Sequence, residues 1–184
     1  CAQNIIDEND KMLQQKQQYP LLKDSISLFH NEDAQVMLLS LFKKLDMEAL
    51  QNKEALETFD FCFTNPPWYS SQEDYEKEEA GIAAMSNVAE NELFTPGGEV
   101  GFATRLAHES CELKDRITWF STWLAKEPSK EKVLNVLKNE LAQKPTVILR
   151  TTVTFGHVYA YAWTFSTREF ILTSKASFYW ERVY

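Results

Sequence analysis

The tetrapeptide Asn65-Pro66-Pro67-Trp68, which follows an apolar stretch, holds residue types suited to chemistry on an aromatic amine. A proline has no backbone N–H and a fixed φ, so the two prolines end a strand in a stiff, non-helical turn. The side-chain oxygen of Asn65 and the carbonyl oxygen of Pro66 can then accept the two hydrogens of one exocyclic NH2 group. An amine held in this way can turn its lone pair toward an electrophilic methyl group, without a metal or a nucleophilic side chain.

Two aromatic residues, Trp68 and Tyr69, follow the prolines and are the expected substrate-binding residues. Trp68 can stack on the ring that carries the amine, a contact worth about 1–3 kcal/mol per base. An adenine bound there must be unpaired or flipped out, because base pairing otherwise engages its amine. Asn-Pro-Pro alone fits a turn that closes a buried strand equally well. The apolar strand before it and the aromatic residue after it favour the methyl-transfer interpretation.

The composition predicts one globular domain in a reducing compartment, the nucleus or the cytoplasm. The chain has 184 residues with 44% hydrophobic content, enough for a sizeable core. Its formal charge of −8 has the wrong sign for binding nucleic acid by phosphate neutralisation alone, so RNA contacts require local basic sites. The three scattered cysteines predict neither a disulfide framework nor a zinc site, and no metal is expected. No run is long and apolar enough to predict a membrane span.

The patterns around the motif predict the α/β elements that must position it. Apolar, β-prone runs predict strands at 26–30, 59–64 and 117–124. Apolar residues at helical spacing predict helices at 2–18, at 34–57, from Gly97 onward, and from a cap at Ser129. After Pro145, two β-rich runs predict a closing antiparallel hairpin of 146–155 and 158–165, with a further strand at 170–180.

The stretch 69–96 is longer than most loops of compact domains, which are functional or disordered when they reach this length. We expect it to be mobile and to meet the substrate. Its acidic run, residues 72–79, predicts a solvated surface rather than a grip on RNA. The three tryptophans Trp119, Trp123 and Trp163 lie on expected strands and are predicted to be core residues.

Four ordered segments resemble the methyltransferase-like protein 16 family and its bacterial relatives that methylate adenine in 23S ribosomal RNA. These segments are residues 59–68, 97–105, 117–121 and 160–165. The resemblance implies a class I, Rossmann-like α/β methyltransferase fold that uses S-adenosylmethionine. It further implies an RNA adenine-N6 methyltransferase that acts on an unpaired or flipped adenosine in structured RNA, such as U6 small nuclear RNA. The catalytic positions of the family fall on Asn65, Pro66, Pro67 and Trp68, although the family more often has Phe at the last of them.

The resemblance also implies cofactor contacts at Asn31 and Gln35, after the first expected strand, and at Asn65 beside the methyl group. The glycine-containing motif and the acidic ribose-binding residue of the family have no counterpart, and no Gly-x-Gly occurs in the sequence. Because Cys1 begins inside an expected helix, we expect residues 1–184 to be one partial methyltransferase domain. The N-terminal part of the sheet would then lie outside this chain and act as its partner.

Two functions therefore remain open from the sequence. An intact Asn65-Pro66-Pro67-Trp68 favours an RNA adenine-N6 methyltransferase. The acidic run 72–79 and the absence of a glycine motif favour a catalytically inactive methyltransferase-like subunit that binds RNA or a protein partner.

Overall fold

The computed structural model describes residues 27–31, 33, 35–78, 93–153, 158–168 and 180–184. They fall into two compact units, Cys1–Glu32 and Asp33–Tyr184, and every described helix and strand belongs to the second. The helix predicted at 2–18 lies outside the described residues. The strand predicted at 26–30 is wrong, because residues 27–30 have no regular structure. Leu28 is exposed there.

The second unit is built on a mixed sheet with the strand order β1-β2-β4-β3-β5. Its strands are β1 (Phe59–Thr64), β2 (Ile117–Leu124), β3 (Val147–Val153), β4 (Val158–Thr164) and β5 (Glu181–Arg182). β1 and β2 are parallel, whereas the other three neighbouring pairs are antiparallel. The predicted strands 59–64 and 117–124 and the closing hairpin are confirmed. Residues 170–179 of the strand predicted at 170–180 lie outside the described residues, Trp180 has no regular structure, and β5 covers Glu181–Arg182 beyond that range.

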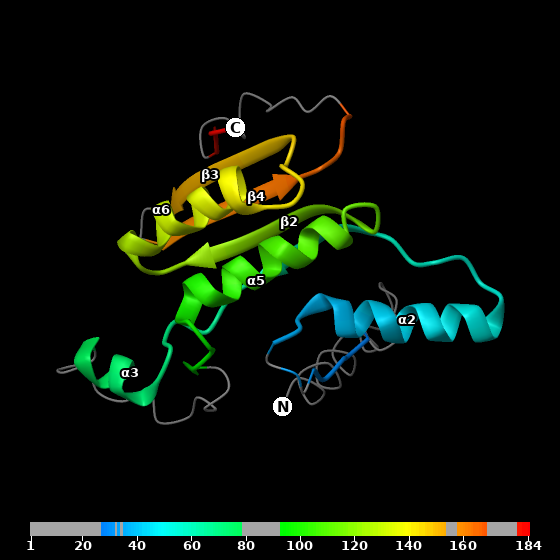
Figure 1. Cartoon of the computed structure of the whole chain (residues 1–184), viewed down its shortest axis with the longest axis horizontal. Helices are drawn as coiled ribbons and strands as arrows, with labels where there is room; N and C mark the ends of the chain where they lie inside the picture. The colour runs from blue at the N-terminus through cyan, green and yellow to red at the C-terminus, as the bar shows by residue number, and fades with distance from the viewer. Residues whose placement is uncertain (1–26, 32, 34, 79–92, 154–157, 169–179) are drawn as a thin grey trace, which may run out of the picture. The chain divides into compact units, whose positions relative to one another are not determined.

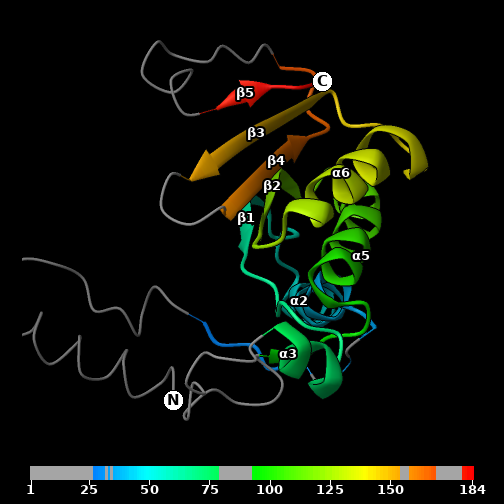
Figure 2. The same cartoon turned by 90° about the vertical axis from the view of Figure 1, so that its left-hand side faces the viewer.

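Helices α5 (Gly98–Glu112) and α6 (Glu127–Asn135) lie against one face of this sheet, as Figures 1 and 2 show from two directions. Helix α2 (Leu38–Asn52) is shorter than the predicted 34–57 and unbroken, and it ends at Lys53 in a left-handed conformation. The predicted loop 69–96 contains helix α3 (Gln72–Glu78), so the acidic run is helical. The other described helical segment is a π-helical turn, η2 (Val136–Glu140), after α6.

The prediction that Ser129 caps a helix is wrong. Helix α6 begins two residues earlier, with Lys126 at its N-cap and Pro128 in its first turn. Proline has the φ of a helix and lacks the N–H that the first turn leaves unpaired, so it sets the start here. The backbone N–H of Ser129 donates to the carbonyl of Lys126 at 3.1 Å, inside the helix.

Alternation along the strands divides the sheet into two faces of different character. The face under α5 and α6 holds Phe120, which stacks on Trp163 with ring centroids 5.9 Å apart. The Trp163 indole N–H donates to Ser110 Oγ of α5 at 2.9 Å, which ties helix to sheet. On the opposite face, Phe63 and Trp123 are exposed. Trp163 is therefore a core residue as predicted, but Trp123 is not.

Helix α2 is joined to the rest of the unit through a carboxylate of α5. Glu109 is buried, and its two oxygens accept the backbone N–H groups of Met37, Leu38 and Leu39 at 2.7–3.1 Å. These are N–H groups that the first turn of a helix cannot satisfy by itself. Glu109 therefore acts as the cap of α2, although it lies about 70 residues away along the chain.

Candidate active site

The Asn-Pro-Pro-Trp motif begins at the carboxyl end of β1, beside the carboxyl end of the parallel strand β2. Thr64, the last residue of β1, is in register with Thr122 of β2. The Thr64 hydroxyl donates to the carbonyl of Ser121 at 3.0 Å, and the Ser121 hydroxyl donates to that of Cys62 at 2.9 Å. Side chains thus reinforce the strand pairing where the chain leaves the sheet. This is the edge at which α/β folds bind their ligands.

The residues of the motif differ in their exposure to solvent, which distinguishes those that could contact a substrate from those that support the turn. Asn65 is exposed, Pro66 is buried and Pro67 is partly buried. Trp68 is 43% exposed, so much of its indole is open to solvent. The buried proline fixes the turn, while the amide of Asn65 and the indole of Trp68 lie at the surface where a base could reach them.

Tyr69, the second aromatic predicted to bind substrate, is only 5% exposed. Its ring packs edge-on against Tyr75 of α3, with centroids 5.1 Å apart, and lies 4.6 Å from the ammonium of Lys126. Its backbone pairs with that of Phe94 in a parallel β-bridge. Tyr69 is therefore a buried residue that supports the turn. Its predicted contact with the substrate stays a prediction.

The two glycines at the start of α5, Gly97 and Gly98, lie next to the motif. Gly98 has a φ of +58°, and a Cβ on it would lie 3.2 Å from the Trp68 carbonyl oxygen. The N–H of Gly98 donates to Thr95, whose own N–H donates to the carbonyl of Tyr69 at 3.0 Å. Only glycine adopts this conformation readily and permits so close an approach of two backbones. The sequence predicted the helix start correctly, but not that it touches the motif.

Arg105 of α5 fastens the segment that leads into this glycine pair. Its guanidinium donates to Thr95 Oγ1 at 2.6 Å and to the Pro96 carbonyl at 2.8 Å. Burial lowers the pKa of Arg105 from its ordinary value. Arg105 thus has a positioning role at the start of α5.

Glu99 links the start of α5, beside the motif, to the end of β2. The side chain is 2% exposed, and its carboxylate accepts the backbone N–H groups of Ala125 at 2.6 Å and Lys126 at 2.9 Å. These residues connect β2 to α6. Glu99 therefore holds three segments of the substrate edge together: the start of α5, the β2–α6 connection and, through Gly98, the motif. A glutamate in the first turn of a helix gives no such signal in the sequence.

The acidic helix α3 contacts the motif through Asp74. The Asp74 carboxylate accepts both the backbone N–H and the hydroxyl of Ser70, at 3.0 and 3.1 Å. The hydrogen bond from the Ser70 backbone holds the pKa of Asp74 below its ordinary value. The Lys126 ammonium lies 3.8 Å from the same Asp74 oxygen, Oδ2. At least one of the acidic residues predicted to be solvated therefore orders the chain directly after Trp68.

None of the contacts given for the described residues joins the three residues that are predicted to bind the cofactor. Asn31 belongs to the first compact unit, whereas Gln35 and Asn65 belong to the second. Gln35 is exposed, and its N–H donates to the Asp33 carboxylate at 2.8 Å ahead of α2. The start of α2 is bound to Glu109, about 16 Å along α5 from Gly98 at the helical rise per residue. The grouping of these residues around one cofactor stays a prediction.

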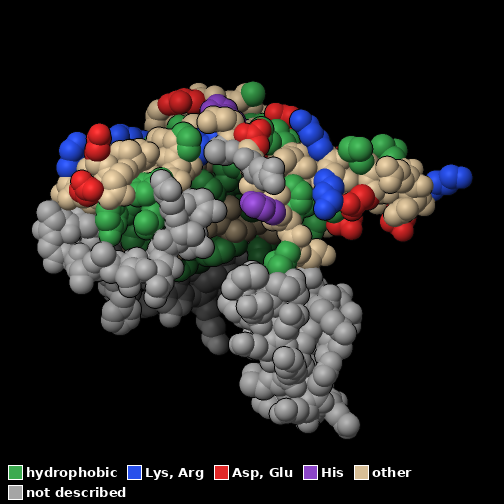
Figure 3. Space-filling model, turned by 90° about the horizontal axis from the view of Figure 1, so that it is seen from below, with side chains coloured by type: hydrophobic (Ala, Val, Ile, Leu, Met, Phe, Trp, Pro, Cys, Tyr) green, Lys and Arg blue, Asp and Glu red, His purple; other side chains and the backbone are tan. Residues whose placement is uncertain are grey.

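Neither a metal centre nor a membrane segment is found in the described part of the chain. It holds no cluster of three or more His, Cys, Asp or Glu side chains that could bind a metal ion. None of its helices has the length and apolarity to cross a membrane. On the face shown in Figure 3, Lys and Arg side chains are interspersed with Asp and Glu rather than gathered into one basic patch.

Comparison with known proteins shows several relatives. A family model described as RNA methyltransferase matches residues 17–167. The chain is 32% identical over 136 residues to the RNA N(6)-adenosine-methyltransferase mettl16 of Danio rerio, which covers 67% of the chain and 27% of the relative. It is 32% identical over 115 residues to the U6 small nuclear RNA (adenine-(43)-N(6))-methyltransferase of Schizosaccharomyces pombe, covering 61% and 29%. The chain thus spans less than a third of the length of either.

Among solved structures, the chain is similar to the hMettl16 catalytic domain in complex with MAT2A 3'UTR hairpin 1. The TM-score is 0.50 at 21% identity, covering 71% of this chain and 54% of that one. The complex with MAT2A 3'UTR hairpin 6 gives the same TM-score at 23% identity. At these identities the likeness shows the fold alone.

Proposed function

The chain belongs to the methyltransferase-like protein 16 family of RNA methyltransferases and has the class I methyltransferase fold, and we propose that it carries the substrate-amine side of an RNA adenine-N6 methyltransferase. The substrate is an unpaired or flipped adenosine in structured RNA, such as U6 small nuclear RNA, in the nucleus or the cytoplasm. The methyl donor is S-adenosylmethionine. The names of the relatives in Danio rerio and Schizosaccharomyces pombe support this activity.

One observation carries the proposal: the exposed amide of Asn65 and the half-exposed indole of Trp68 stand together at the carboxyl end of β1, on a turn held by buried neighbours. Asn65 Oδ1 and the Pro66 carbonyl accept the two N6 hydrogens of the adenine, and Trp68 stacks on its ring. Fixing both hydrogens turns the nitrogen lone pair out of the ring plane. This positioning lowers the barrier without any covalent role for the protein.

We further propose that Asn65 is also the residue beside the methyl group of the donor. The burial of Pro66 supports this role, because it would hold the neighbouring Asn65 in one position. S-adenosylmethionine supplies the electrophilic methyl when bound. The 184 residues contain no Gly-x-Gly turn for the rest of the donor. We propose that tight donor binding needs more contacts than Asn65, Gln35 and Asn31 supply.

Trp68 tests the stacking part of the proposal. Trp68→Ala should lower kcat/KM for RNA methylation in the complete protein by about 5- to 150-fold, the equivalent of one base stack. Trp68→Phe should retain much of the activity, since a π-face remains. Nuclease digestion and mass spectrometry of the RNA measure N6-methyladenosine, and Tyr184→Ala serves as the control for loss of an exposed aromatic residue. Equal losses in the Ala and Phe variants would mean that Trp68 packs rather than stacks.

Donor binding separates the enzyme from the second candidate, a catalytically inactive subunit. That candidate is favoured by the missing glycine turn and by the acidic helix α3 beside the motif. We expect the 184-residue chain alone to bind S-adenosylmethionine no more tightly than about 1 mM, or about 4 kcal/mol, because Asn65, Gln35 and Asn31 offer too few contacts.

The matched experiment restores the missing contacts. A chimera in which the N-terminal part of the Danio rerio methyltransferase domain precedes this chain should bind the donor at micromolar concentration and methylate RNA. Isothermal calorimetry on both proteins gives the comparison. Micromolar binding of the donor by the chain alone would show that our assignment of the cofactor site is wrong. A chimera that binds RNA but no donor would favour the inactive subunit.

A further inference from the structure

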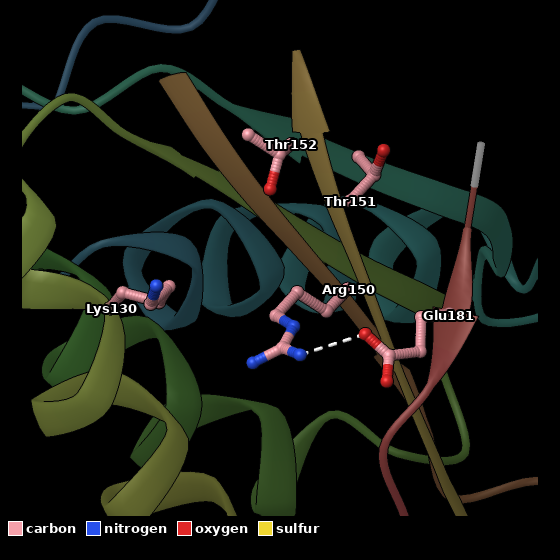
Figure 4. Close-up of a pocket in the computed structure, with 5 residues that line it drawn as sticks. All are labelled: Lys130, Arg150, Thr151, Thr152 and Glu181. Carbon is pink, nitrogen blue, oxygen red and sulfur yellow. Dashed lines mark hydrogen bonds and ion pairs between the residues drawn. The ribbon is translucent and has the colours of Figure 1, made fainter. Parts of the chain in front are cut away.

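A cavity of about 230 Å3 lies on the same sheet as the motif, two strands beyond β2. Its lining residues are Lys130, Arg150, Thr151, Thr152 and Glu181, shown in Figure 4. They come from α6, β3 and β5. None of them belongs to the motif or to the contacts that hold it.

The strand register places this cavity level with the motif. Thr64, directly before Asn65, pairs with Thr122 of β2, which pairs with Tyr161 of β4, which pairs with Arg150 of β3. Because neighbouring strands lie about 4.8 Å apart, Arg150 is about 14 Å from Thr64 across the sheet. Thr64 and Arg150 also share the face that carries α6, since paired residues point the same way. A polymer bound at Asn65 could therefore reach the cavity directly.

Two partly buried cations line the cavity. The side chain of Lys130 is 18% exposed and that of Arg150 is 28% exposed. Figure 4 shows the Arg150 guanidinium extending between Lys130 and Glu181. Charges that are largely withdrawn from solvent interact more strongly with a bound anion than exposed surface charges do.

Both cations are held in place before any ligand arrives. The Lys130 ammonium donates to the Glu127 carboxylate of the same helix at 2.6 Å and lies 4.7 Å from the centre of the Tyr159 ring. The Lys130 carbonyl accepts the Tyr161 hydroxyl at 3.2 Å. One nitrogen of Arg150 donates to Glu181 at 2.7 Å, and this hydrogen bond raises the pKa of Arg150. The guanidinium has five N–H donors, so this one bond leaves capacity for an oxyanion. Thr152 adds a hydroxyl on the same face.

We propose that this cavity binds a backbone phosphate of the RNA substrate, with Lys130 and Arg150 as its ligands and Thr152 as a further donor. The inference rests on the proposed function, which places the target base at Asn65. A phosphate 14 Å away is about four nucleotides from the target at the 3.4 Å rise of a stacked strand, and fewer if the strand is extended. The acidic chain thus has one of the local basic sites that it needs to bind RNA.

The carboxylate Glu181 gives the cavity its selectivity. Glu181 neutralises Arg150 in the free protein, as Glu127 neutralises Lys130, and it would repel an anion that approaches Arg150. Its side chain is 65% exposed and comes from a two-residue strand, so it can turn toward solvent when a phosphate replaces it. A phosphate that the rest of the bound RNA holds in the cavity can therefore displace Glu181 from Arg150. A free anion that binds weakly cannot.

The test uses the complete protein and an RNA hairpin with one unpaired adenosine in its loop. Single methylphosphonate linkages, which carry no charge, replace the phosphates one at a time on both sides of that adenosine. We expect the Kd to rise about tenfold at one linkage within about four nucleotides, the loss of one charged hydrogen-bonding contact. Arg150→Gln and Lys130→Gln should each weaken binding of unmodified RNA and abolish the sensitivity to that linkage.

Two further variants distinguish ligand binding from a structural role. Glu181→Gln should tighten RNA binding several-fold, because it removes the competing carboxylate, whereas a merely structural Arg150–Glu181 pair would give the opposite sign. Lys44→Gln, which also loses a lysine paired with a glutamate, should change nothing. Equal effects of all linkages, a position effect that survives Arg150→Gln, or no RNA binding would overturn the cavity assignment. RNA binding with the expected position effect but no methylated adenosine would overturn the proposed function alone.

Discussion

Replacing Asn65 with Ala in the complete protein should reduce methyl transfer to RNA by roughly 10²- to 10³-fold, the loss expected when one preorganised polar partner of the reacting group is removed. The amide of Asn65 is exposed, so its removal leaves no buried group unpaired. One N6 hydrogen of the adenine then has no fixed acceptor, and the lone pair is no longer held toward the methyl group. RNA affinity should change little, since Trp68 and the rest of the surface remain.

The measurement is single-turnover methylation with excess enzyme, together with thermal unfolding to confirm the fold. Asn52→Ala is the matched control, because Asn52 is also an exposed asparagine at the end of an element, here α2. Asn65→Asp retains an acceptor at the position and should lie between Ala and the natural residue. Normal turnover by Asn65→Ala would refute the paired-acceptor mechanism.

Glu99→Ala should destabilise the protein by about 2–6 kcal/mol, a large part of the stability of a typical domain. The change leaves the N–H groups of Ala125 and Lys126 without their acceptor in a part-buried site, at about 1–3 kcal/mol each. It also loosens the start of α5, where Gly98 touches the Trp68 carbonyl. Methylation should therefore fall even at temperatures where the variant is still folded.

Urea unfolding measures the stability difference. Glu112→Ala on the same helix is the matched control, because Glu112 is exposed and should stay within about 0.5 kcal/mol. Glu99→Gln retains one acceptor oxygen and should lose about half as much stability as Glu99→Ala. If Glu99→Ala unfolded like Glu112→Ala, the carboxylate would not be holding the β2–α6 connection.

Local patterns predicted those elements whose residues alternate or are bounded by strong breakers. Residues 59–64 form a strand that the two prolines end, and 117–124 alternate between a buried and a more open face. The apolar run 26–30 carries the same local signal but no strand forms at 27–30, because a strand also needs burial against neighbours. Helix α3 was missed because Gln72–Glu78 has no apolar stripe to indicate a helix.

The motif itself could be predicted from the sequence, but its supports could not. Glu99 and Glu109 look like ordinary solvated residues of an amphipathic helix, and their partners lie 26 to 72 residues away. Tyr69 follows Trp68 directly and has the same chemical character, yet one side chain is buried and the other is open. Only the packing of 93–98 and α3 against the turn distinguishes them. The cavity around Arg150 likewise depends on a register that joins four strands.

Helix α5 carries two buried carboxylates that serve different neighbours, Glu99 beside the β2–α6 connection and Glu109 at the start of α2. Each residue turns a helix by about 100°, so the ten residue steps from Glu99 to Glu109 fix the angle between the two side chains. One inserted or deleted residue would rotate one carboxylate away from its partners and leave at least two N–H groups unsatisfied. The stretch between Glu99 and Glu109 is therefore a spacer of fixed length. A substitution at its exposed position, His108, leaves this spacing unchanged, whereas an insertion or deletion does not.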